Sequence, residues 1–264
     1  MRVLRSMLYL TNLLTVNNSK LLKTELCAYS VEACRVAARL GVNRVELCAS
    51  PAEGGVTPSL ATIEQVAEIE GLDPSVMIRP RGGDFLYSDE EFSTMLLDIE
   101  HARKAGATGV VFGILTADGK VDVERTRQLV EASHGMETTF HRAVDMTEEY
   151  EAAIEAVIEA GCNRILTSGG YDKAIDGIDN IRRAVELSHG RIEIMAGSGV
   201  VAANALALKN TGVDALHFSA KKMVMGGMQY RNPRISMGGS SAVDEFSLRV
   251  VDEAEVKEIL KLIR

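Results

Sequence analysis

The feature that most constrains the fold is an alternation of short apolar segments with amphipathic segments, which begins near residue 21 and repeats about eight times. The apolar segments have the length of strands, and the amphipathic segments have the periodicity of helices. Glycine follows several helical segments, as at Gly41, Gly106 and Gly161, where a helix ends and the chain turns back. This pattern predicts an α/β protein, a TIM-like (β/α)8 barrel that forms a single domain over residues 21–264.

The expected elements follow from this alternation. An open doubly wound sheet is the alternative, but it requires a glycine-rich fingerprint after the first strand, which residues 27–31 do not supply. We expect strands at 22–28, 44–49, 76–80, 109–115, 138–142, 164–168, 192–197 and 215–219, and helices near 31–40, 59–70, 88–105, 122–133, 148–160, 173–188, 201–210 and 253–262.

Two stretches lie outside the repeat. Residues 1–20 form an N-terminal extension whose Arg-bearing, acid-free sequence leaves a transit peptide or an upstream start codon open. Residues 220–251 follow strand eight and exceed the usual loop length, and such loops are usually functional or disordered. We expect this segment to be ordered, to fold over or beside the barrel mouth near His217 and Arg79, and to contribute to an oligomer interface. A surface loop without a function is the alternative.

Composition and charge narrow the range of functions that the chain can have. The chain has 264 residues, a net charge of −8 and no basic run, which disfavours nucleic-acid binding. The apolar run in residues 1–16 is too short to span a bilayer, so we expect no membrane association. The four cysteines are scattered through a long chain, as is typical of reduced thiols in a cytoplasmic protein.

The sequence Glu-Leu-Cys-Ala occurs twice, at 25–28 and 46–49, in the first two strands. Parallel neighbouring strands lie roughly 4.8 Å apart and alternate their side chains, so the two glutamates and two cysteines should share one face. In one interpretation, Cys27 and Cys48 pack like small apolar residues and have no other role. The other is a soft metal site, and Cu(I) accepts two thiolates more readily than Zn(II), which prefers four ligands.

The strand ends also allow an enzyme, because chemistry in such barrels occurs at the carboxyl ends of the strands. In this alternative the protein acts on a small anionic or phosphorylated metabolite, with Glu46 and His141 as the acid–base pair and Arg79 holding the anion. Structural roles remain open for both: a satisfied buried histidine, and an arginine paired with Glu46 or Asp84. The candidate phosphate-binding residues follow strands seven and eight, namely Gly197, Ser198, Gly199 and Ser219.

Longer motifs resemble one family, the copper homeostasis protein family CutC. The motifs occur in order at residues 25–30, 44–49, 53–59, 78–89, 139–146, 164–170 and 228–233. The resemblance implies a TIM-like barrel, a cytoplasmic homo-oligomer (a dimer or a tetramer) and a link to copper handling. It also implies that Cys27 and Cys48 bind Cu(I). Two thiolates and two carboxylates carry more negative charge than one monovalent cation can balance, so we expect Arg79 or His141 to offset part of it. No reaction follows from the resemblance.

Overall fold

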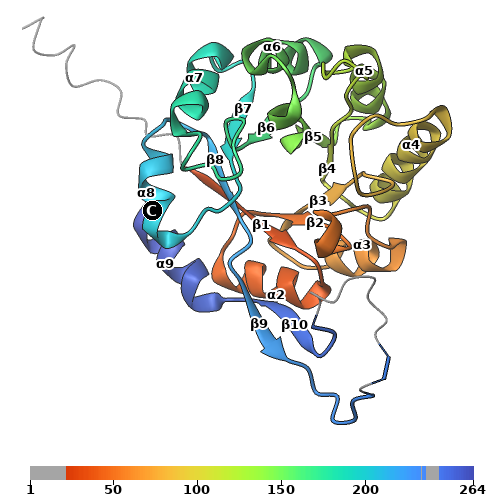
Figure 1. Cartoon of the computed structure of the whole chain (residues 1–264), viewed down its shortest axis with the longest axis vertical. Coiled ribbons are helices and arrows are strands. Elements are labelled where there is room, and N and C mark those ends of the chain that lie inside the picture. Colours follow the sequence, from red (N-terminus) through yellow and green to blue (C-terminus); the bar gives the residue numbers. More distant parts are fainter. Residues whose placement is uncertain (1–21, 233, 236–243) are drawn as a thin grey trace, which may run out of the picture.

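A closed barrel of eight parallel strands forms the centre of the protein, with helices around it (Figure 1). The computed structural model describes residues 22–232, 234–235 and 244–264. The strands follow one another around the barrel from β1 to β8, and β8 closes it by pairing with β1. This confirms the predicted TIM-like fold. The predicted extension at residues 1–20 lies outside the described residues.

The elements alternate as the sequence predicts. The barrel strands are β1 (Lys23–Ala28), β2 (Arg44–Leu47), β3 (Asp73–Met77), β4 (Gly109–Phe112), β5 (Glu137–Phe140), β6 (Arg164–Thr167), β7 (Glu193–Ala196) and β8 (Ala215–Phe218). The helices are α2 (Val31–Leu40), α3 (Leu60–Ala67), α4 (Asp89–Lys104), α5 (Val123–Ala132), α6 (Tyr150–Ala160), α7 (Ile178–Ser188), α8 (Ala202–Lys209) and α9 (Glu253–Ile263), with two short 3₁₀ helices, η1 (Pro51–Glu53) and η2 (Arg142–Met146).

Several predicted strand boundaries were wrong by a few residues. Strand β3 begins at Asp73, three residues before the expected Val76, because Pro74 is tolerated near the start of a strand, where its missing N–H removes little pairing. Strand β4 ends at Phe112 instead of Leu115, since the Leu115 N–H leaves the sheet and donates to Phe85 O. Strand β3 likewise ends at Met77 instead of Pro80, and these two early ends lengthen the loops that surround the barrel mouth.

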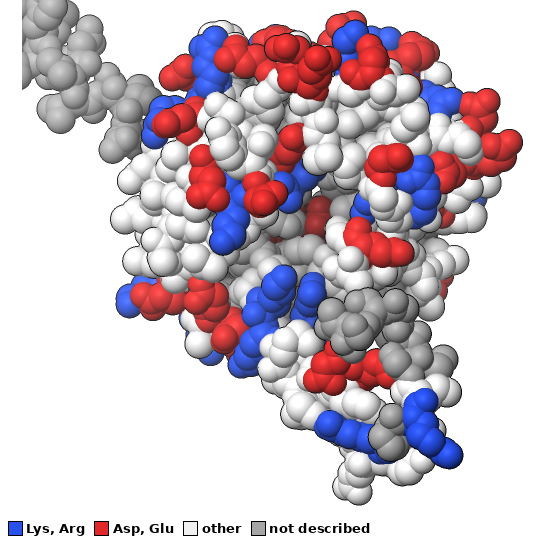
Figure 2. All heavy atoms as spheres, viewed as in Figure 1, with Lys and Arg blue, Asp and Glu red and all other residues white. Residues whose placement is uncertain are grey.

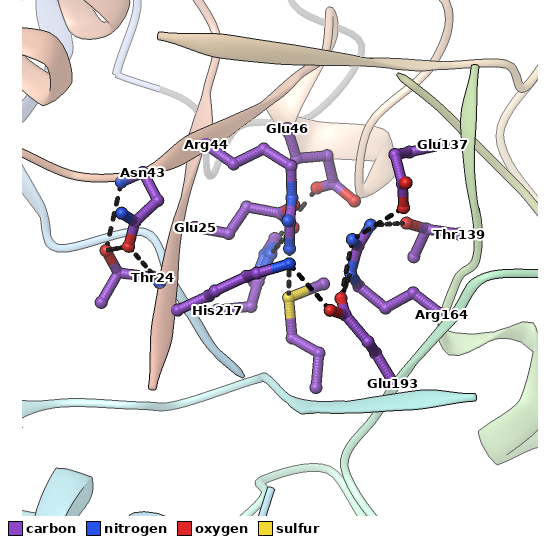
Figure 3. Close-up of polar contacts among 12 residues, drawn as sticks. Thr24, Glu25, Asn43, Arg44, Glu46, Glu137, Thr139, Arg164, Glu193 and His217 are labelled. Carbon is purple, nitrogen blue, oxygen red and sulfur yellow. Dashed lines mark hydrogen bonds and ion pairs between the residues drawn. The ribbon is translucent and has the colours of Figure 1, made fainter. Parts of the chain in front are cut away.

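The inside of the barrel is more polar than the layer between strands and helices. The outer layer holds one large apolar cluster that includes Val45, Val110 and Ile194. Inside, Figure 3 shows Arg44 beside Glu25, and Arg164 between Glu137 and Glu193. Buried charges are stable only when they are paired, so each of these two arginines is matched by carboxylates on neighbouring strands.

The segment after β8 forms an antiparallel ribbon of β9 (Lys221–Met225) and β10 (Ser247–Val251), which projects from the barrel beside α2 (Figure 1). The prediction described 220–251 as a loop; both ends of it are strands. Its middle, at Pro233 and residues 236–243, lies outside the described residues. Among the helices that the structure does describe, none is long and apolar enough to cross a bilayer.

Candidate metal and ligand site at the barrel mouth

A cavity of about 1060 Å³ opens at the carboxyl ends of the strands, and Figure 2 shows it as a hollow at the centre of the molecule. Its lining includes Cys27, Glu46, Arg79, His141 and His217. With Ser198, Gly199 and Ser219, the structure therefore brings seven of the sequence-predicted residues together in one place, as expected for the carboxyl face of a barrel of this type.

Glu25 is the fully buried anion at the base of the mouth. Its carboxylate forms a close ion pair with Arg44, and its Oε1 lies 2.8 Å from His217 Nδ1 (Figure 3). Burial alone would raise the pKa of Glu25, but the positive charge of Arg44 and the hydrogen bond with His217 outweigh it and lower the pKa to about 2. Glu25 is thus ionised at neutral pH.

His217 connects this carboxylate to the cysteines. Glu25 and His217 are direct neighbours in the register of β1 and β8. Gly197 makes room for His217 and Leu166, because a Cβ at that position would lie 3.2 Å from His217 Cδ2 and 2.5 Å from Leu166 Cδ1. Burial would lower the pKa of His217, but Glu46, Cys27 and Glu25 together raise it well above the usual value. The imidazole is therefore the cation of this part of the cavity.

Glu46 and the two cysteines surround the other side of the His217 ring. Burial, followed by the nearby Cys27 and Glu25 and despite His217, raises the pKa of Glu46 well above its usual value. A hydrogen bond from Cys48, together with His217, lowers the pKa of Cys27 well below its usual value despite burial. The same hydrogen bond, with burial and Glu46, raises the pKa of Cys48. Cys27 is therefore the more readily ionised thiol of the pair, and Cys48 the less readily ionised one.

Three of these residues offer atoms that could hold one ion. The donor atoms of Cys27, Glu46 and His217 all lie within 4.8 Å of one another. Cys48 Sγ lies 3.5 Å from Glu46 Oε2 and extends the group. The other cysteines, Cys34 and Cys162, are buried elsewhere, where burial raises the pKa of each thiol to about 12.

Arg79 has a different environment from the one the sequence predicted. Its Nη1 donates to the carbonyl oxygens of Glu53 (2.7 Å) and Gly55 (2.9 Å), and its Nη2 donates to Gly83 O (2.8 Å). Among the described residues its salt-bridge partners include neither Glu46 nor Asp84, so the structural alternative left open by the sequence does not apply. Through these hydrogen bonds Arg79 holds two loops of the mouth together. Its Nε is buried without a hydrogen-bond partner.

His141 lies on the same wall as Arg79, packed 4.9 Å from the Phe85 ring between centroids. Gly113 is required beside it, because a Cβ there would lie 2.5 Å from the imidazole. Burial, and then the charges of Arg79 and Arg142, lower the pKa of His141 to about 3. A neutral imidazole cannot offset negative charge, so the expected charge compensation by Arg79 or His141 is supplied in the structure by Arg44 and His217.

Some polar groups of the predicted phosphate-binding loop already have hydrogen-bond partners within the protein. Ser198, Gly199 and Ser219 line the cavity, but Ser198 Oγ donates to Asp172 O (2.5 Å). At the start of α8 the Ala202 N–H donates to Glu255 Oε1 (2.7 Å). A carboxylate therefore already occupies the position in which an anion would meet this helix. Phosphate binding at this loop stays a prediction.

Sequence reasoning missed Arg44 and Arg249 as contributors to the site, and it placed His217 at the barrel mouth without a role. Arg44 and His217 are the partners of Glu25, and Arg249 of the β9–β10 ribbon lies over the Tyr29 ring at 5.6 Å. The only signal available for His217 was its position in strand eight, next to strand one in a closed barrel. Nothing local to Arg249 indicates a residue that lines the mouth.

Comparisons with known proteins agree with this geometry. The model of the CutC family matches residues 22–222. A CutC family protein of Bacteroides fragilis is 46% identical over 241 residues, which are 90% of this chain and 96% of that protein. The human copper homeostasis protein cutC homolog is 41% identical over 236 residues, which are 89% of this chain and 86% of that protein.

Solved structures give the same result. The structure of CutC from Streptococcus agalactiae superposes with a TM-score of 0.71 at 35% identity, covering 75% of this chain and 98% of that one. An aldolase superposes with a TM-score of 0.59 at 17% identity, which shows the shared barrel fold alone. By the family match, the identities and the superposition together, this chain belongs to the CutC family.

Proposed function

We propose that the chain takes part in copper homeostasis by binding Cu(I) at the barrel mouth through Cys27 and Cys48. The observation that carries the proposal is the clustering of Cys27 with His217 and Glu46 within 4.8 Å, beside a second thiol. Thiolates are soft ligands that select Cu(I) among biological metals. The names of the relatives, which include a copper homeostasis protein, support the same role.

The charges around the sulfurs fit a monovalent cation. Cys27 has the lowered pKa expected of a ready thiolate, and Cys48 supplies a second sulfur once copper displaces its proton. His217 is close enough to act as a third donor when it loses its proton to solvent. Glu25 remains with Arg44, so its charge is compensated whether or not the ion is present.

The test is a Cu(I) titration under reducing conditions against a competing chelator. Wild-type protein should bind about one equivalent per chain, as two soft ligands suggest. The Cys27→Ser/Cys48→Ser variant should lose more than the roughly 10–100-fold in affinity that removal of an outer partner of a metal ligand costs. The matched control is Cys34→Ser/Cys162→Ser, which removes two buried thiols elsewhere. Equal affinity in both double variants would refute the assignment.

Cytoplasmic location and homo-oligomer formation are further parts of this proposal and rest on the family resemblance. The β9–β10 ribbon supports an oligomer, because Met223, Met225 and Leu248 are each more than half exposed there. Exposed apolar groups of this kind commonly mark protein–protein contacts. Native mass measurement distinguishes a monomer from the expected dimer or tetramer.

A further inference from the structure

The mouth cavity is far larger than a metal ion requires. Its volume of about 1060 Å³ lies just above the roughly 300–1,000 Å³ of pockets that hold whole small molecules. The cysteines lie near the ends of β1 and β2, whereas Arg79 and His141 lie near the ends of β3 and β5, further around the barrel mouth. Copper binding at the cysteines therefore leaves this second wall without a function.

Unpartnered polar atoms gather around this cavity. In the described part of the chain, six buried side-chain nitrogen or oxygen atoms have no hydrogen-bond partner. Three of them belong to residues that line the cavity: Glu46 Oε1, Arg79 Nε and His141 Nε2. Buried polar groups are nearly always paired, so a concentration of unpaired ones at a cavity indicates that something which enters the cavity completes them.

The proton on His141 can be placed from its hydrogen bond. Its Nδ1 accepts from the Ala143 N–H at 3.1 Å, so the neutral ring carries its proton on Nε2. The low pKa of about 3, caused first by burial, keeps the ring neutral at physiological pH. His141 is thus a fixed hydrogen-bond donor, only 5% exposed, that is unsuited to be the general base that the sequence suggested.

Two basic side chains lie at the rim of the cavity. Lys221 and Arg249 lie on the paired strands β9 and β10, and both line the cavity. Among the described residues no carboxylate lies within salt-bridge distance of either. Figure 2 shows basic side chains on the side of the hollow nearest the ribbon. The acidic Asp252 and Glu255 nearby are engaged, as caps of the backbone N–H groups of Ala254 and Ala202.

We propose that this cavity binds a small organic anion, with its acid group between Lys221 and Arg249 and a carbonyl or hydroxyl oxygen accepting from His141 Nε2. The site is distinct from the predicted phosphate loop, where Ser198 and Glu255 already use the available groups. It does not depend on copper, because none of the three contacts involves Cys27 or Cys48. Attraction of the anion by the two cations should weaken with salt.

Calorimetric titration in the absence of copper tests the proposal with two probes, 2-oxoglutarate for a carboxylate source and glycerol 3-phosphate for a phosphate source. At least one should bind to one site per chain with a millimolar or lower Kd. The Lys221→Met/Arg249→Met variant should bind that probe at least about tenfold more weakly than wild type does. The matched control, Lys104→Met/Arg103→Met on the outer helix α4, should leave it unchanged.

Two further variants separate this site from copper binding. His141→Phe keeps a ring against Phe85 but removes the donor, so it should also weaken the probe. Cys27→Ser/Cys48→Ser should bind the probe as wild type does, even if it no longer binds Cu(I). The proposal is overturned if neither probe binds wild-type protein, or if the exposed Lys221/Arg249 pair can be removed with no more effect than the α4 pair.

Discussion

The two histidines of the mouth cavity lie on two different walls of the same barrel, so comparing them shows how the walls differ. His217 and His141 are both buried, at 8% and 5% exposure, yet the pKa of His217 is raised and the pKa of His141 is lowered to about 3. Burial acts on both in the same direction, towards the neutral ring. The neighbours decide the outcome: Glu46, Cys27 and Glu25 surround His217, whereas Arg79 and Arg142 are the charges near His141.

The two walls therefore suit different ligands. The wall of β8, β1 and β2 holds groups of both charges and sulfur donors, which suits a metal cation. The wall of β3 and β5 holds a neutral donor and an arginine tied to loop carbonyls, which suits an uncharged oxygen of a ligand. Three changes would break or sharpen this contrast.

The largest effect is expected from Glu25→Gln. It keeps the shape of the side chain but leaves Arg44 and His217 without their buried anion. Breaking a buried pair in this way costs about 3–5 kcal/mol of the free energy of unfolding. Urea denaturation measures it, and NMR titration should show the pKa of His217 moving towards the behaviour of His141. Glu155→Gln, which removes the exposed partner of Arg191, is the control and should change little; a cost for Glu25→Gln no greater than this control would contradict the contrast.

A smaller effect is expected from acidification acting on His141. Its folded-state pKa lies below the unfolded value of about 6.5, so the unfolded chain binds the proton first. The contribution of His141 to stability is complete above pH 6.5 and is lost as pH falls towards 3, by about 1.4 kcal/mol per pH unit and about 3 kcal/mol by pH 4. His141→Phe should flatten the curve of unfolding free energy against pH in this window by that amount. Parallel curves for the two proteins would show that His141 titrates normally.

The smallest effect is expected from Gly113→Ala. The new Cβ would lie 2.5 Å from the His141 ring and 2.8 Å from Ala143 Cβ. Overpacking of this kind costs about 1–3 kcal/mol. Gly227→Ala is the control, since a Cβ at that position meets nothing within 4 Å. Thermal unfolding compares the two, and an unchanged Tm for Gly113→Ala would mean that the ring moves freely and is not a fixed donor.

The sequence by itself determined the barrel and much of its mouth. Periodicity and helix-ending glycines are local signals, and they were sufficient to predict eight strand–helix units. The Glu-Leu-Cys-Ala repeat predicted that Cys27 and Cys48 face one side of neighbouring strands, because side-chain alternation follows directly from strand geometry. Boundaries were less accurate, as at Pro74, since pairing with neighbours tolerates a residue that local propensity disfavours.

Tertiary structure decided how the groups at the mouth are charged. Glu25 and His217 are 192 residues apart and meet only because the last strand closes on the first. Arg79 could have bound an anion, a carboxylate or a loop, and the folded loops present carbonyl oxygens that take its Nη atoms. The pKa of a buried group depends on which charges long-range packing brings beside it, so no local pattern could have shown that two buried histidines of one cavity would differ.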